Sequence, residues 1–139
     1  MADWYGSARS NYIRVKDEPA FLAALEELDQ GVEAGRNDKG QLTLLAANTD
    51  NGGWPSSRYN EQTDDFDDFD IAEFVVPYLA DGEVAIFLEV GAEKLRYVTG
   101  SATAVDNKGG RVRLRLGDIY EAAATALGVV PTSITEALY

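Results

Sequence analysis

Carboxylates are the residues best suited to chemistry in this sequence, and they are concentrated in one short segment. Between positions 61 and 73 there are seven acidic residues and no basic one: Glu61, Asp64, Asp65, Asp67, Asp68, Asp70 and Glu73. Closely spaced carboxylates can stand in for the phosphates of a nucleic acid, because a basic groove exchanges its counterions with either group. The same run is also typical of a solvated loop that leads into a helix N-terminus, where acids are favoured.

Calcium binding is a second chemistry open to these carboxylates, but the spacing argues against it. An EF-hand loop needs alternate oxygen ligands, a glycine at its sixth position and a glutamate at its twelfth. The run that starts at Asp64 has Phe69 at the sixth position, and the run that starts at Asn48 has its glycine, Gly52, one position early. We therefore predict no metal site and no cofactor.

The composition removes most catalytic chemistry. The 139 residues include no cysteine and no histidine, which excludes disulfides, thiolate metal sites, thiol nucleophiles and the imidazole base of catalytic triads. A carboxylate pair can hydrolyse glycosides, but no spacing selects one pair from the 24 acids. The glycine-containing turns also lack the phosphate-binding loop patterns. We expect no catalytic residues and a non-enzymatic protein, with a carboxylate-based enzyme as the alternative.

The net charge of −12 restricts the partners of this protein. Such a charge repels nucleic acid and anionic membranes and steers association toward basic surfaces. We therefore expect no direct binding to nucleic acid or membrane, and a partner with a basic groove. High solubility is the alternative explanation, because net charge constrains partners and not fold or function.

Basic residues are segregated into a block of their own. Positions 94–115 hold six bases and one acid, Asp106; the bases are Lys94, Arg96, Lys108, Arg111, Arg113 and Arg115. From position 111 arginines alternate with aliphatic residues, so a strand places the arginines on one face. This face can bind anions, or it can pair with neighbouring acids and protect a sheet edge from aggregation.

Aromatic residues in loops are candidates for an interface anchor, because tryptophan and tyrosine dominate binding hot spots. Trp54 lies between Gly53 and Pro55, and the pair Trp4 and Tyr5 lies near the N-terminus. A loop tryptophan folded over the core is an equally good interpretation of Trp54.

Hydrophobic periodicity predicts the elements that position these residues. We expect strands at residues 12–15, 32–36, 42–46, 84–90, 95–105 and 111–116. The 84–90 run is almost wholly apolar, which is typical of a strand buried on both faces. Residues 48–68 are predicted to be a loop. The order β-α-β-β-α-β-β-β-α indicates an α+β fold with a mostly antiparallel sheet, forming one domain over residues 1–139.

Helix signals complete this prediction. Asp17 is suited to cap a first helix, and a second helix starts near Asp68 or Asp70 and is kinked or ended at Pro77. Asp118 and Glu121 predict a reciprocal cap for a third helix that ends at Gly128. We expect residues 129–139 to pack along the surface of the domain. No apolar run is long enough to cross a bilayer and no secretory signal is evident, so we expect a cytoplasmic protein.

Three segments carry a resemblance to known sequences: Trp4-Tyr5-Gly6, residues 10–17 and residues 91–97. With them the chain resembles uncharacterised small acidic accessory proteins of bacterial plasmids, integrative elements and phages. No catalytic motif is known for that group, so the resemblance assigns no functional residue. Small acidic proteins in such mobile genetic elements are often anti-restriction or anti-CRISPR factors. The resemblance therefore implies a role of this kind for the present protein.

These observations lead to one hypothesis with a rival. The first is an anti-defence inhibitor, a nucleic-acid mimic that binds a host nucleic-acid-binding complex and blocks its basic groove. Its partner-binding residues would be the seven acids between 61 and 73 together with Trp54. The rival is a non-enzymatic interaction or regulatory module, such as a homodimer built on an exposed sheet edge and the apolar tail.

Overall fold

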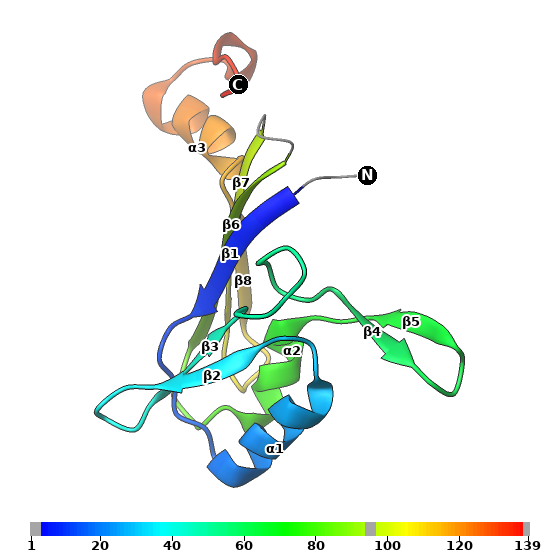
Figure 1. Ribbon diagram of the computed structural model, residues 1–139. Helices are drawn as coiled ribbons and strands as arrows, with labels where there is room; N and C mark the ends of the chain where they lie inside the picture. Colours follow the sequence, from blue (N-terminus) through cyan, green and yellow to red (C-terminus); the bar gives the residue numbers. More distant parts are fainter. Residues whose placement is uncertain (1–3, 94–96, 138–139) are drawn as a thin grey trace.

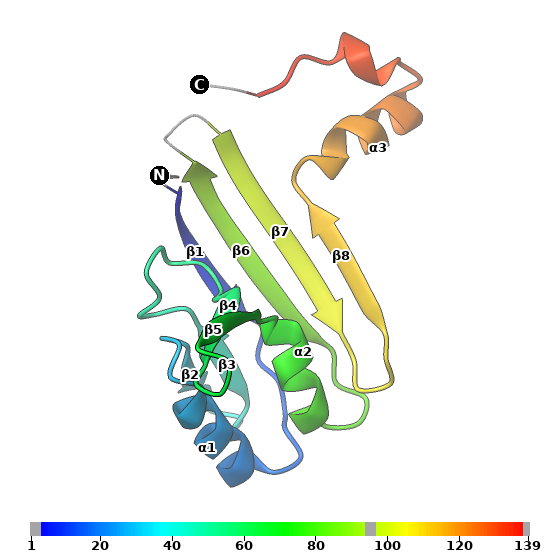
Figure 2. The same ribbon diagram turned by 90° about the vertical axis from the view of Figure 1, so that its right-hand side faces the viewer.

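The computed structural model describes residues 4–93 and 97–137, so Lys94 and Arg96 of the basic block lie outside the described residues. Figures 1 and 2 show a twisted sheet with two helices and a short hairpin on one side. The α+β class and the mostly antiparallel sheet are confirmed. The elements are β1 (Trp4–Ser10), α1 (Glu18–Leu28), β2 (Glu33–Arg36), β3 (Leu42–Leu45), β4 (Ser57–Asn60), β5 (Asp65–Asp68), α2 (Ile71–Val75), η1 (Val76–Tyr78), β6 (Ala85–Glu93), β7 (Tyr97–Val105), β8 (Arg111–Arg115), α3 (Asp118–Leu127) and η2 (Pro131–Ser133).

The large sheet has six strands in the order β2-β3-β1-β6-β7-β8, with antiparallel neighbours throughout. The prediction of a first strand at residues 12–15 is wrong. The first strand is β1, and residues 12–15 contribute only the isolated bridges of Ile13 to Leu42 and of Val15 to Leu79. Small and polar residues hide β1 from a periodicity argument, since its stability comes from pairing with β6 over its whole length.

One end of the sheet holds the core. Helices α1 and α2 lie on the same side of the sheet at this end (Figure 2). The buried side chains of these helices pack against those of the strands and of the connecting segments. The fully buried side chains of this core include Phe21, Val75, Leu79, Ile13 and Leu44. The core therefore covers only part of the long strands β6 to β8, whose other ends extend beyond the helices (Figure 2).

Caps and a proline set the limits of the helices, as the sequence predicts for the first two. The Asp17 carboxylate accepts the Ala20 N–H at 3.1 Å and begins α1. The Asp70 carboxylate accepts the Ala72 N–H at 3.0 Å and begins α2. This helix ends after five residues and continues as the 3₁₀ turn η1, which contains Pro77, because proline removes a helical hydrogen bond.

The prediction that residues 84–90 are buried on both faces is wrong. In β6 the side chains of Ala85 and Phe87 are buried, whereas those of Leu88 and Val90 are about half exposed. A continuous apolar run is typical of a two-sided buried strand, but here one of the two faces of the strand is apolar and uncovered.

The expected cap of the third helix is also wrong. The N-cap of α3 is Gly117, which has no side chain to cap the helix. The Asp118 carboxylate instead accepts a hydrogen bond from the backbone N–H of Arg115 at 2.7 Å. Gly128 ends the helix in the left-handed conformation, as predicted.

The prediction that the tail packs along the domain is wrong for its described part. Residues 129–137 are mostly exposed, and the Ala137 backbone N–H donates to the Tyr120 hydroxyl of α3. Helix α3 buries only Ala124, so α3 and the described tail make few apolar contacts with the body of the protein.

The turn between β7 and β8 supports a prediction about pH. The Asp106 carboxylate accepts the Lys108 N–H at 2.9 Å and the Gly110 N–H at 2.7 Å, and these bonds hold the pKa of Asp106 below its ordinary value. Because the folded pKa lies below the unfolded one, the stabilisation is complete above the unfolded pKa and is lost as the pH falls through the folded pKa. Carboxyl NMR titration is expected to give a lower midpoint for Asp106 in the folded protein than in a peptide of residues 104–112. Equal midpoints would contradict this account.

No helix among the described residues is long and apolar enough to cross a membrane.

Candidate functional site

The acidic segment is not the loop that the sequence predicts, because most of it forms a two-stranded hairpin. Strands β4 and β5 pair with each other and with no other strand, and the hairpin projects from the body (Figure 1). The side chains of Glu61, Asp64, Asp65, Asp67 and Asp68 are exposed. Residues 57–68 contain these five acids and one base, Arg58, so the hairpin has a net charge of −4. The hairpin therefore presents predicted site residues to solvent on a support that can reach into a groove.

An aromatic pair on one face holds the hairpin together. The rings of Tyr59 and Phe66 lie opposite each other in the register with centroids 5.5 Å apart. The Tyr59 hydroxyl donates to the Asp64 carboxylate, which raises the pKa of Tyr59 above its ordinary value because the bond stabilises the neutral phenol. On the other face, the Asn60 amide donates to Asp67 at 2.9 Å. These contacts fix the positions of two of the acids.

The last two acids of the segment lie outside the hairpin. Asp70 caps α2 and forms an ion pair with Arg111 at 2.7 Å, so its carboxylate has partners within the chain. Glu73 is exposed on the first turn of α2. Of the seven predicted acids, the structure therefore brings five together on the hairpin and leaves Asp70 and Glu73 at its base.

Trp54 is packed on the body, as in the alternative interpretation of this residue. Its ring contacts Phe87 edge-on at 5.6 Å between centroids, and its backbone N–H donates to the Glu89 carboxylate at 2.8 Å. Trp4 is held similarly, with its indole N–H donating to Thr99 at 2.8 Å. Both tryptophans thus attach the loop of residues 47–56 and the start of β1 to the sheet.

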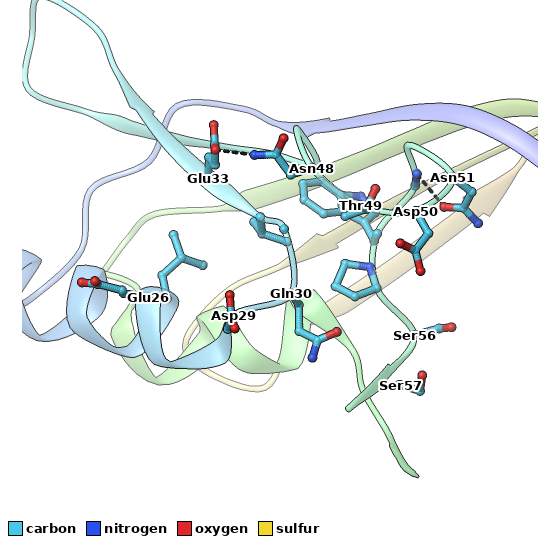
Figure 3. Close-up of a pocket in the computed structure, with 16 residues that line it drawn as sticks. Glu26, Asp29, Gln30, Glu33, Asn48, Thr49, Asp50, Asn51, Ser56 and Ser57 are labelled. Carbon is cyan, nitrogen blue, oxygen red and sulfur yellow. Dashed lines mark hydrogen bonds between the residues drawn. The ribbon is translucent and has the colours of Figure 1, made fainter. Parts of the chain in front are cut away.

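A groove of about 650 Å³ lies between the end of α1, the start of β2 and the loop that precedes β4 (Figure 3). Its described lining includes four acids and no base; the acids are Glu26 from α1, Asp29 at the C-cap of α1, Glu33 from β2 and Asp50 from the loop. Glu33 accepts a hydrogen bond from Asn48. Two polar atoms of its lining residues, Thr49 Oγ1 and Trp54 Nε1, are buried without a partner among the described residues.

This groove reaches Ser57, the first residue of β4, so the acidic surface continues from the hairpin onto α1. Its four acids are far apart in the sequence, and periodicity gave no signal that would group them. Within the described residues, no three carboxylates gather closely enough to hold a metal ion. A concave surface lined by separated carboxylates suits several cationic groups at once, such as the side chains of a basic protein surface.

The arginines of β8 lie on the face of the sheet that also holds Phe87 and Val105, as the register shows. Arg111 pairs with Asp70, in agreement with the interpretation that these arginines pair with neighbouring acids. Arg113 and Arg115 are exposed, and β8 is an edge strand, where charged side chains discourage pairing with other chains.

Comparison with protein-family models, with curated proteins and with solved structures found no match to this chain.

Proposed function

We propose that this protein is a non-enzymatic inhibitor of a bacterial defence system, of the anti-restriction or anti-CRISPR kind, which occludes the nucleic-acid groove of a host complex. The observation that carries the proposal is the projecting β4–β5 hairpin, with five exposed carboxylates and one base. A two-stranded hairpin is narrower than the six-stranded sheet and its helices, so it can enter a groove from which the rest of the protein is excluded.

The acidic groove beside the hairpin extends the proposed contact. Glu26, Asp29, Glu33 and Asp50 line it, and no base is among its described lining residues. Carboxylates spread over two connected surfaces match the spread of basic side chains along a nucleic-acid site better than one cluster does. Charge of this kind raises the association rate and makes binding sensitive to salt.

The hairpin is suited to a partner-binding role because the core does not need it. Its exposed side chains contribute no residue to the buried cluster, and its aromatic pair is internal to the hairpin. Substitutions there are expected to change binding and leave folding intact, so loss of binding can be assigned to the acidic surface.

Neutralising four hairpin acids is expected to weaken capture of the target strongly. The variant carries Asp64→Asn, Asp65→Asn, Asp67→Asn and Asp68→Asn; asparagine also tolerates the positive φ of 53° at residue 64. Immobilised protein is incubated with lysates of bacteria that carry restriction or CRISPR systems, and retained proteins are identified at low and high salt. We expect the parent protein to retain a nucleic-acid-binding complex at low salt and lose it at high salt, with roughly tenfold or greater weakening in the variant.

The matched control neutralises four exposed acids elsewhere: Asp38→Asn, Glu27→Gln, Asp81→Asn and Glu136→Gln. Both variants change the net charge from −12 to −8, so only the location of the charge differs. Equal retention by the two variants would show that overall charge, and not the hairpin, attracts the partner. Retention of a complex by the fourfold hairpin variant at the parent level would refute the proposal.

A further inference from the structure

One face of the long strands is apolar and uncovered. The register places Tyr5, Leu88, Val90, Val98, Val112 and Leu114 on the same side of β1, β6, β7 and β8. Leu116 and Ile119 continue this surface from the end of β8 into α3. These eight side chains define the bare face, and each is between 46% and 69% exposed. In Figure 1, α1, α2 and the hairpin all lie on the opposite side of the strands.

Helix α3 stands at the edge of the bare face and is itself uncovered. The only buried residue among its side chains is Ala124, whereas Ile119 and Leu127 are 63% and 74% exposed. Together with the strands it lines a groove of about 810 Å³, which is walled by Leu88, Val90, Val98, Leu114, Leu116 and Ile119. A groove and a projecting apolar helix thus lie side by side on the same surface.

The area of the bare face matches the requirement of a dimer. At about 50 Å² for each half-exposed aliphatic side chain and about 130 Å² for the tyrosine, the eight side chains present roughly 500 Å² of apolar surface. An interface of standard size buries about 800 Å² per partner, of which about 60% is apolar, or roughly 500 Å². A patch of roughly 500 Å² lies in the upper part of the range of the largest apolar patch on a typical monomer, and such patches are often functional.

The charge distribution permits a second copy of this chain as the occupant of the bare face. Two copies, each with a net charge of −12, repel each other over most of their surfaces. By the register, the described strands β1, β6, β7 and β8 place no carboxylate on the bare face and one charged residue, Arg9. Two copies can therefore approach through this face with the least repulsion.

We propose that the protein is a homodimer in which the bare face of one copy packs on the bare face of a second, with each α3 in the groove of its partner. A two-fold interface requires one surface to contain both the projection and its receptor, and α3 and its groove satisfy this. Pairing through the edge of β8 is disfavoured, because it would bring the arginines of the two copies together. The interface is distinct from the acidic hairpin, so this proposal does not depend on the proposed function.

Light scattering after size exclusion tests the proposal with the intact chain. We expect a mass twice the 15.1 kDa of the chain, falling to the mass of one chain for Leu114→Lys. Leu114 is 60% exposed, so the fold should survive, which circular dichroism checks. The control is Phe66→Lys, which adds the same charge at a 66% exposed apolar residue of the hairpin, and which we expect to remain dimeric.

Two results would overturn the dimer: a parent protein with the mass of one chain at every concentration, or a folded Leu114→Lys variant that keeps the doubled mass. If Leu114→Lys does not fold, Val98→Lys gives the same test from β7. A further readout uses the absence of native cysteine: maleimide labelling of Leu114→Cys should slow as protein concentration rises. A labelling rate independent of concentration would also overturn it.

Discussion

Replacing Gly52 with alanine is expected to destabilise the protein by about 3 kcal/mol or more. Gly52 has a φ of +83°, and a Cβ atom there would lie 1.9 Å from the carbonyl oxygen of Gly6. The loop must then move away from β1, which breaks the 2.8 Å bond from the Gly6 N–H to the Asn51 carbonyl. Urea unfolding followed by circular dichroism measures the change in the free energy of unfolding.

Gly40→Ala is the control that separates backbone conformation from steric contact. Gly40 has a similar φ of +73°, but an added Cβ atom meets nothing within 4 Å. Its replacement is expected to cost only about 1 kcal/mol, which is the cost of the left-handed conformation for alanine. Equal losses for the two variants would show that the loop yields freely and that its close approach to β1 contributes little to stability.

Truncating Phe21 to alanine is expected to cost about 3 to 5 kcal/mol, because it removes a large buried side chain and leaves a cavity. Phe21 is fully buried on α1. Its ring centroid lies 5.3 Å from that of Tyr78 and 6.4 Å from that of Phe74, so it joins α1 to α2 and η1. Thermal and urea unfolding should both show the loss.

The control for this variant is Phe66→Ala in the hairpin. Phe66 is 66% exposed and its described aromatic partner is Tyr59, so its truncation is expected to change the free energy of unfolding by less than about 1 kcal/mol. A comparable loss for both variants would contradict the view that the core lies under α1 and α2 and that the hairpin is independent of it.

Local signals in the sequence were sufficient for several elements. The spacing of Phe21, Leu25 and Leu28 predicted α1, and their side chains are buried. Asp17 caps α1 as expected, α2 begins next to Asp70, one of its two predicted starts, and α2 ends before Pro77. These features depend on residues within one or two turns of each other, so the sequence contains all the information that they need.

Part of the candidate site could also be predicted. The run of acids identified the charged segment, because local composition determines charge. It did not reveal that the segment forms a hairpin, since strands β4 and β5 contain Ser57, Arg58 and four consecutive residues that include three aspartates. Residues of this kind have low strand propensity, and cross-strand contacts such as Tyr59 with Phe66 compensate for it.

Composition gives the charge and the absence of cysteine and histidine, and local caps and apolar stripes give the first two helices. Other features follow from packing between distant segments: β1 lies at residues 4–10, acids near the end of α1, in β2 and in a loop line one groove, and one face of β6 to β8 is bare. An apolar strand has the same sequence whether its second face is covered or open to a partner. Burial of a strand depends on which other segments pack against it, and those segments lie far away along the chain.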